Sequence, residues 1–481
     1  MTPDLANPIT SGLTELAGGD HDLALAVAPQ LTRPARPTVL RRVPARTRPA
    51  EAARPRSQAL RVSLGALVGS RLLVWMGGVG TVLVLGYGPE RGAFDPRGVT
   101  SGFGWLGNLL AAPAARWDAA WYLVIAHYGY SPLLGSYTAP RDAFFPLYPL
   151  GIRAVSELGV APLLAGVAIS LAALSAALYL LYRIVVMELG ERQMDTARLA
   201  VLLCAFAPMG FFLSAVYSES LYLALSLGVF LCARRGRWMW VGVLGALAAA
   251  TRSAGLLLIV PALWLYLYGP RQDRAPDRDP LTLTGLARAL PRYRLRGDVA
   301  WLLLVGAGVA AFGAYLGLSG GSVLAPFHSQ EVWGRHFAGP FVGAWDGLRA
   351  AFESARQLIS MQRAHSYLPA GGGDPTIAAE HNLVLFAFLA LAVPALIGTF
   401  RRLPPAYGLY TLAALALPLS YPVATQPLMS LPRFLLVLFP LPIWWAMWLE
   451  GKPRLRVGAL VLSAALMVFF GAEFTTWHWV A

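Results

Sequence analysis

Long hydrophobic stretches separated by short polar segments dominate the chain and predict a membrane protein that crosses the bilayer several times. A membrane-spanning α-helix needs about 20 apolar residues. We expect the shorter stretches to extend at their ends or to pack against neighbouring helices. The pattern predicts an all-α polytopic fold with about eleven spans, at residues 61–87, 160–187, 198–216, 219–233, 238–252, 254–269, 299–318, 380–400, 407–422, 431–449 and 456–478.

Residues 1–58 contain no such stretch and predict a disordered cytoplasmic tail. The part from Arg33 to Arg56 is rich in proline and arginine, a composition that buries too little apolar surface to fold alone. The first hydrophobic stretch begins near residue 60 and is too long for the core of a signal peptide. We therefore divide the chain into a tail, residues 1–58, and a transmembrane domain, residues 59–481.

Arginine in the connecting segments predicts the orientation of the chain, because basic residues are concentrated in cytoplasmic loops. With the tail in the cytoplasm, two long segments, 88–159 and 319–379, lie on the opposite face. Stretches such as 342–360 predict interfacial helices in these segments. The expected location is the cell membrane, with a cytoplasmic N-terminus. The segments that this orientation places in the cytoplasm are 188–198, 234–237, 271–296, 401–402 and 451–456.

Composition agrees with a membrane protein and argues against several other classes. Hydrophobic residues make up 57% of the chain and charged residues 13%, against about 25% charged in soluble domains. The net charge of +14 does not indicate a nucleic-acid partner, because short basic loops more often set membrane topology. Cys204 and Cys232 both lie in apolar stretches and provide neither a disulfide framework nor metal-ligand spacing.

The candidate site residues fall on the predicted non-cytoplasmic face. A charged residue at a membrane is costly unless it has a function, and Asp118, directly after Trp117, is the candidate catalytic residue. In glycosyl transfer, a carboxylate takes the proton of the acceptor hydroxyl, and arginine neutralises a leaving phosphate through its fork of donors. The candidate substrate-binding residues are Arg116, Trp117, His127, Glu219, Arg252, Gln330, Arg335 and Arg433.

Structural interpretations of the same residues remain open. Asp118 is also placed to pair with Arg116 or to cap a helix. Glu219 is also explained as an acid favoured by the dipole at a helix N-terminus, and Arg252 as a snorkelling side chain. Arg71, inside the first stretch, is expected to reach the cytoplasmic surface or to pair internally.

Several short motifs, taken in order, resemble the PIG-V family of mannosyltransferases and its bacterial relatives. Each motif is common by itself, but together they run from residue 116 to residue 434. The matching segments are RWDAAWY, IAHYGY, AFFPLYP, APMGFF, YSESLY, TRSAG and PRF. The chain departs from the family pattern at Ala254, where the family commonly has asparagine, and at Ala207, where it has serine.

The resemblance implies a GT-C glycosyltransferase fold with its active site in extracytoplasmic loops, so that residues 59–481 form the catalytic domain. The donor implied is a polyprenyl-phosphate mannose, and the acceptor is a hydroxyl of a lipid or glycoconjugate. The resemblance also implies inversion at the anomeric carbon, Asp118 as the catalytic residue, and no metal or other cofactor. Besides these substrates, membrane lipids are the expected partners, and nucleic acid is not.

Two alternatives remain at the level of the sequence. The first is a transferase of the same fold that moves another sugar or acts on protein hydroxyls. The second is a transporter or lipid flippase. Transporters place polar residues near the middle of the bilayer, often within internal repeats. The charged candidates of this chain instead lie at the ends of spans on one face.

Overall fold

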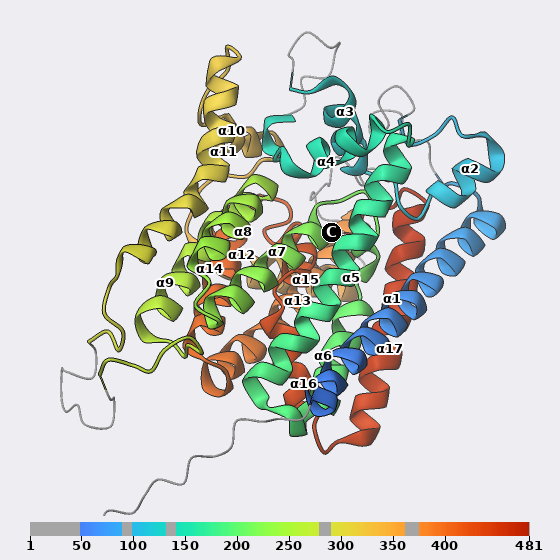
Figure 1. Cartoon of the computed structure of the whole chain (residues 1–481). Helices are drawn as coiled ribbons and strands as arrows, with labels where there is room; N and C mark the ends of the chain where they lie inside the picture. The colour runs from blue at the N-terminus through green and yellow to red at the C-terminus, as the bar shows by residue number, and fades with distance from the viewer. Residues whose placement is uncertain (1–48, 89–98, 131–140, 279–289, 361–374, 481) are drawn as a thin grey trace, which may run out of the picture. The chain divides into compact units, whose positions relative to one another are not determined.

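The computed structural model describes residues 49–88, 99–130, 141–278, 290–360 and 375–480, and these residues are almost entirely helical (Figure 1). The elements in chain order are α1 (Pro49–Leu85), α2 (Gly104–Ala111), α3 (Ala119–Tyr128), η3 (Arg141–Ala143), α4 (Leu147–Ser156), α5 (Pro162–Leu189), η4 (Glu191–Gln193), α6 (Met194–Ala205), η5 (Gly210–Leu213), α7 (Glu219–Arg234), α8 (Trp238–Thr251), η6 (Ser253–Leu258), α9 (Ile259–Tyr268), η8 (Gly297–Gly306), α10 (Ala307–Leu318), α11 (Ala325–His328), η9 (Ser329–Trp333), α12 (Pro340–Ser360), α13 (Pro375–Arg402), α14 (Pro405–Leu419), α15 (Leu431–Leu436), α16 (Pro440–Trp448) and α17 (Pro453–Thr475). Elements labelled η are 3-10 helices.

The described residues include five helical segments that are long and apolar enough to cross a membrane. Shorter apolar helices, Trp238–Thr251, Ser253–Tyr268 and Pro405–Leu419, lie among them. The chain is therefore a polytopic membrane protein. The five long segments are Arg56–Leu85, Pro162–Leu189, Gly297–Leu318, Thr376–Arg402 and Pro453–Thr475.

This number is smaller than the predicted number of spans, because proline interrupts some of the hydrophobic stretches. The stretch 198–216 leaves the α-helix after Ala205, shortly before Pro208, and proline disfavours the helical conformation of the residue before it. The stretch 431–449 divides into α15 and α16 at Pro440. A proline cannot donate to the carbonyl four positions earlier, and its ring collides with that carbonyl.

The predicted boundary of the tail also differs from the structure. Residues 49–58, which the composition assigned to the tail, form the first turns of α1. The rest of the predicted tail, residues 1–48, lies outside the described residues. The predicted interfacial stretch 342–360 corresponds to α12, in which large apolar side chains such as Phe341, Trp345 and Phe352 are exposed.

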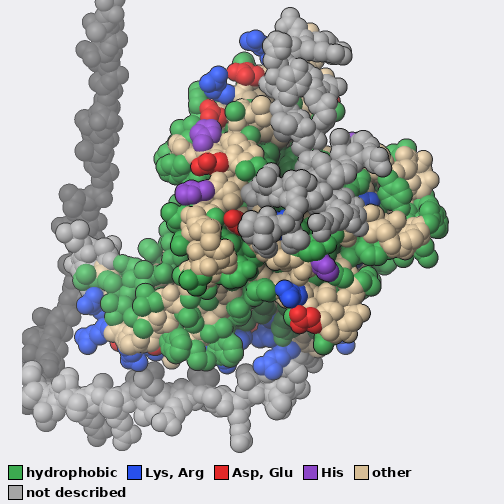
Figure 2. All heavy atoms as spheres, turned by 90° about the horizontal axis from the view of Figure 1, so that it is seen from above, with side chains coloured by type: hydrophobic (Ala, Val, Ile, Leu, Met, Phe, Trp, Pro, Cys, Tyr) green, Lys and Arg blue, Asp and Glu red, His purple; other side chains and the backbone are tan. Residues whose placement is uncertain are grey.

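The helices of residues 49–481 pack as a bundle around α5, α7 and α8. Helix α7 lies between α5 and α8, and α1 runs beside α17 (Figure 1). We call the end where α7 begins and α8 ends the site end of the bundle. Viewed from above in Figure 2, the described surface is largely hydrophobic, with charged side chains in small groups. Such extensive apolar surface is typical of a protein that contacts membrane lipid.

A buried arginine in the first span supports the break between α6 and α7. The guanidinium of Arg71 donates to the carbonyls of Ala205 at 3.0 Å and Gly210 at 2.8 Å, and to the Ser214 hydroxyl at 2.7 Å. The last carbonyls of a helix have no partner within the helix, so Arg71 satisfies groups at the end of α6. The sequence predicted that Arg71 either reaches the cytoplasmic surface or pairs internally, and the structure shows internal pairing.

Another buried arginine fixes the opposite end of the bundle. Arg234, at the end of α7, bonds both carboxylate oxygens of Glu188 on α5, at 2.5 and 3.1 Å. The Tyr407 hydroxyl of α14 also donates to Glu188, at 2.8 Å. Because α5 and α7 are tied at this end, the start of α7 has a fixed position at the site end.

Candidate active site

The candidate catalytic residue lies in a sharp turn between α2 and α3. Trp117 has φ = 55°, a left-handed conformation that costs energy for a bulky residue. The Tyr217 hydroxyl closes the turn, since it accepts from the Asp118 amide at 3.1 Å and donates to the Arg116 carbonyl at 3.0 Å. The surroundings therefore hold Asp118 at the start of α3 in a conformation that the isolated segment would disfavour.

Arg433 of α15 connects the two candidate carboxylates. Its Nη1 donates to Asp118 Oδ2 at 2.5 Å, and its Nε donates to Glu219 Oε1. Ser430, the residue that precedes α15, has φ = 67° and directs the chain into the helix. The structure thus joins residues that are 315 positions apart in the sequence.

Glu219 is the first residue of α7, and its side chain is completely buried. The guanidinium of Arg252, which directly follows α8, lies 2.7 Å from the same Glu219 Oε1 atom. Oε2 of Glu219 has no hydrogen-bond partner among the described residues. A carboxylate at a helix N-terminus is favoured by the helix dipole, and here it also draws two guanidinium groups together.

Arg335 is a third buried guanidinium at this place. It donates to the carbonyls of Tyr421 at 3.3 Å and Met429 at 2.9 Å, and the described residues form no ion pair with it. Burial, together with the positive charge of Arg433 and despite the opposing charge of Asp118, lowers the pKa of Arg335 to about 10. The side chain is therefore still protonated at neutral pH, but its charge is poorly compensated.

Asp118, Glu219, Arg252, Arg335 and Arg433 together form what we call the arginine–carboxylate cluster. Its three guanidinium groups and two carboxylates leave a surplus of one positive charge. Phe434 packs between two of the arginines, with its ring centroid 5.4 Å from Arg252 Cζ and 5.8 Å from Arg335 Cζ. A largely buried group of this kind favours an anion carrying one negative charge, because attraction is stronger where water is excluded.

Arg116 and Trp117 make contacts that the sequence did not predict. The sequence left open a pair between Arg116 and Asp118, but it is Arg433 that bonds Asp118. Arg116 Nε donates to the Thr475 carbonyl at 2.9 Å, and its Cζ lies 4.9 Å from the centroid of the Trp477 ring. The ring of Trp117 is buried and packs against Trp477 and Trp479.

Among the described residues, His127 and Gln330 make no polar contact with the arginine–carboxylate cluster. His127 is exposed near the end of α3, and its ring packs edge-on against Tyr128 at 4.3 Å. Gln330 lies in η9 and is partly buried. Neither side chain has a hydrogen bond or ion pair to a cluster residue within the described part of the chain, so their predicted roles gain no support from the geometry.

Several residues of the site were not predicted from the sequence. Tyr217 and Phe434 lie within two positions of Glu219 and Arg433, but in the sequence they are indistinguishable from other aromatic residues of a membrane protein. Trp477 lies at the end of the last hydrophobic stretch and Trp479 directly follows it, where tryptophan is common at a membrane surface. The only sequence signal for Tyr217 and Phe434 was their position next to charged motifs. The hydrophobic pattern did not distinguish Trp477 and Trp479 from ordinary interfacial tryptophans.

Within the described ranges, no group of three or more His, Cys, Asp or Glu side chains is arranged to hold a metal ion. The cluster itself offers two carboxylates that are already bonded to arginines. Metal independence remains a prediction.

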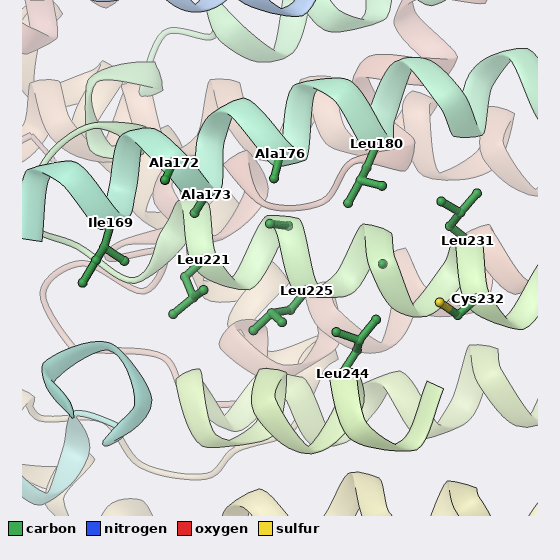
Figure 3. Close-up of a pocket in the computed structure, with 12 residues that line it drawn as sticks. Ile169, Ala172, Ala173, Ala176, Leu180, Leu221, Leu225, Leu231, Cys232 and Leu244 are labelled. Atoms are coloured by element: carbon green, nitrogen blue, oxygen red, sulfur yellow. The ribbon is translucent and has the colours of Figure 1, made fainter. Parts of the chain in front are cut away.

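An apolar groove runs along α5, α7 and α8 (Figure 3). Its volume is about 530 Å³, and small side chains such as Ala172, Ala176 and Ala224 leave the space between the helices. It extends from Leu221, within one turn of Glu219, to Cys232, and α8 contributes Leu244. Because α7 begins at Glu219 and α8 ends before Arg252, two of the helices that line the groove lead to the arginine–carboxylate cluster.

Comparison with known proteins finds a partial match to one family. Residues 104–264 match the family model described as Mannosyltransferase (PIG-V). This part of the chain is similar to the PIG-V mannosyltransferase family. The matched residues include Asp118, Glu219 and Arg252, whereas Arg335 and Arg433 lie beyond the matched range. The structure therefore adds the second half of the cluster to what the family match covers.

Curated proteins similar to this chain carry the name GPI alpha-1,6-mannosyltransferase 2. The rat protein (Rattus norvegicus) is 32% identical over 162 residues, which are 32% of this chain and 32% of the relative. The human protein (Homo sapiens) is 32% identical over 179 residues, 34% of each chain. The similarity thus spans about a third of the length of these relatives. No solved structure matches the chain.

Proposed function

We propose that this chain is a membrane mannosyltransferase of the PIG-V family that moves mannose from a polyprenyl-phosphate mannose to a hydroxyl group of a lipid or glycoconjugate. The observation that carries the proposal is the arginine–carboxylate cluster, in which Asp118 lies beside buried guanidinium groups with one surplus positive charge. The family match supports mannosyl transfer. The lipid-linked donor and the acceptor class are our own extension of that match.

In the proposed reaction, Asp118 acts as the general base. Its carboxylate takes the proton of the acceptor hydroxyl while the hydroxyl oxygen attacks the anomeric carbon of mannose. The bond between that carbon and the phosphate oxygen breaks, and its electron pair leaves with polyprenyl phosphate. The phosphodiester donor carries one negative charge and the phosphate product carries two. Arg252, Arg335 and Arg433 stabilise this additional charge as it develops.

The charge of the cluster and the apolar groove together support a lipid-phosphate donor. A single surplus positive charge matches the single negative charge of a sugar phosphodiester. The groove of Figure 3 is lined by apolar side chains and leads along α7 and α8 toward that charge. Apolar chains gain about 0.8 kcal/mol for each buried methylene group. The proposed donor therefore places its phosphate at the arginines and its polyprenyl chain in the groove.

The proposal includes the GT-C fold and an extracytoplasmic site. The supporting observation is the distribution of charge, since the arginine-rich segments around Arg234 and Arg271 lie at the end of the bundle opposite the cluster. Basic residues favour the cytoplasmic side, which leaves the cluster outside. An inverting transfer would give an α-mannoside from a β-linked donor.

The test uses membranes that contain the full chain, radiolabelled polyprenyl-phosphate mannose and a total lipid extract. We expect transfer of label to an acceptor, and α-mannosidase should release it. Membranes from a strain without the protein provide the control. Absence of transfer together with a loss of solute uptake in the deletion strain would overturn the proposal in favour of transport. Transfer from a sugar nucleotide but not from the lipid would overturn the donor.

A further inference from the structure

The last described residues of the chain pack directly on the turn that carries Asp118. The Trp117 ring contacts Trp477 and Trp479 in edge-to-face geometry, with centroids 5.7 and 5.2 Å apart. Trp117 Nε1 donates to the His478 carbonyl at 3.2 Å. Arg116 bonds the Thr475 carbonyl. We call residues 475–480 the C-terminal brace.

The brace also reaches the segment that leads into Arg433. Trp479 and Val480 line a small cavity of about 10 Å³ together with His381 and Gln426. Gln426 is completely buried and lies four positions before Ser430, whose left-handed conformation begins α15. One side of Trp479 therefore faces the Asp118 turn, and another faces the approach to Arg433.

Backbone strain marks the same three places. Among the described residues, the non-glycine positions with positive φ are Trp117, Ser430 and Trp477, at 55°, 67° and 64°. Each such conformation costs energy and persists only where the surroundings impose it. One lies in the Asp118 turn, one begins the helix of Arg433, and one lies in the brace. The brace and the two segments that carry the Asp118–Arg433 pair thus share this property.

We propose that Trp477 and Trp479 are positioning residues, which hold the Asp118 turn in its strained conformation so that the carboxylate keeps its place in the arginine–carboxylate cluster. This inference rests on the proposed function, because it assigns the two tryptophans to the same reaction. Both rings pack on Trp117, and within the described part of the chain neither packs on Asp118 itself, so both act through Trp117. A displacement of about 1 Å in a catalytic group can lower a rate about 100-fold.

The geometry predicts different effects on turnover and on donor binding. Arg252, Arg335 and Arg433 are held by Glu219 and by backbone carbonyls, which the brace does not supply. Loss of a brace ring should therefore lower kcat and leave donor affinity nearly unchanged. A ring that serves only to keep the protein folded would lower the amount of active enzyme without changing the kcat of the folded fraction.

The test compares Trp479→Ala, Trp479→Phe and Trp477→Ala with the wild-type protein in membranes. Turnover is divided by the number of sites that bind a photoreactive polyprenyl phosphate, so that unfolded protein does not count. We expect Trp479→Ala and Trp477→Ala to lower kcat about 10- to 100-fold with less than about a threefold change in donor KM. Trp479→Phe keeps an aromatic edge on Trp117 and should recover most of the activity.

Trp240→Ala is the matched control, because this tryptophan is 48% exposed at the beginning of α8. It should retain wild-type kcat. Wild-type kcat per binding site in both alanine variants would overturn the positioning role, as would a failure of Trp479→Phe to exceed Trp479→Ala. Absence of transfer by the wild-type protein would instead overturn the proposed function, so the two failures are distinguishable.

Discussion

At the scale of single residues, Arg433 determines how the site has to work. Its guanidinium bonds both Asp118 and Glu219. A base that is bonded to an arginine must be released before it can accept a proton from a substrate. An anionic donor phosphate competes for the same guanidinium. We therefore expect the donor to bind before the acceptor and to draw Arg433 away from Asp118.

Glu219 is expected to stabilise the fold because it neutralises the buried Arg433 and the partly buried Arg252. In Glu219→Gln, Arg252 and Arg433 would lose their shared carboxylate, and breaking a buried ion pair costs about 3 to 5 kcal/mol. We predict that the free energy of unfolding falls by about 3 kcal/mol, measured by chemical denaturation in detergent. The matched control is Glu353→Gln, which removes an exposed pair with Arg349 and should change stability by less than about 1 kcal/mol. Equal effects of the two substitutions would contradict the central position of Glu219.

Arg335 is expected to contribute to donor binding rather than to proton transfer. A hydrogen bond to a charged group contributes about 1.5 to 3 kcal/mol. Arg335→Met should therefore raise the donor KM about 10- to 100-fold. Arg335→Lys keeps the charge but not the fork of donors, so its donor KM should lie between those of the wild type and Arg335→Met. Steady-state kinetics with varied donor concentration measures this change.

The control for Arg335 is Arg183→Met on α5, since Arg183 bonds the Tyr179 hydroxyl and has no described contact with the cluster. It should leave the donor KM unchanged. A normal donor KM in Arg335→Met would show that Arg335 serves the fold alone.

The sequence predicted much of the residue chemistry but not the pairing. Asp118, Glu219, Arg252, Arg335 and Arg433 were candidates because charged residues are unusual beside apolar stretches. The partner of Asp118 was expected nearby, at Arg116, whereas the structure supplies Arg433 from a distant helix. Local spacing contains no information on contacts between helices that are far apart in the chain.

At the scale of elements, broken and short helices position the site. Helix α7 begins at Glu219, α8 ends just before Arg252, and α15 has six residues. Each places a charged side chain at a helix end rather than along a continuous span. The hydrophobic pattern located these segments, but it predicted one span, 431–449, where the structure has α15 and α16. It also extended the span at 198–216 beyond the end of α6 at Ala205. A hydrophobicity average does not register a single proline.

The groove along α5, α7 and α8 gives a prediction at this scale. Ala176 is exposed on α5 and lines the groove. Ala176→Trp should fill part of it and raise the KM for polyprenyl-phosphate mannose about tenfold, the loss expected from about two fewer buried methylene groups. A donor with a two-isoprene chain should be unaffected.

The control for the groove is Ala311→Trp, an exposed position on α10 outside the groove. It should bind both donors normally. An equal rise in KM for the long and short donors in Ala176→Trp would contradict the placement of the polyprenyl chain.

At the scale of the whole molecule, residues 49–481 form a helical bundle with two chemically different ends. The site end carries the arginine–carboxylate cluster. The opposite end carries the arginine-rich connections, including Arg271, which stacks on Trp238 and Tyr293. The positions of the arginine-rich loops along the sequence predicted that the arginines and the candidate site lie at opposite ends. Successive spans run in opposite directions, so alternate loops lie at the same end.

The orientation of the bundle can be tested with introduced cysteines. In a background with Cys204 and Cys232 replaced by alanine, Ser322→Cys marks the segment after α10, and Arg192→Cys marks the segment between α5 and α6. A membrane-impermeant maleimide added to intact cells should label Cys at 322 and not at 192. Permeabilised cells should show labelling at both positions. The reverse pattern in intact cells would place the site in the cytoplasm.

The most direct test of the whole account is the turnover of Asp118→Asn. Asparagine keeps the size of the side chain and cannot accept the hydroxyl proton, so kcat should fall at least about 100-fold, while the enzyme still binds the lipid donor. Asp142→Asn, an acidic position in the same segment without a described bond to the cluster, is the control and should retain activity. Turnover of Asp118→Asn equal to that of the wild type would contradict the assignment of Asp118 as the general base.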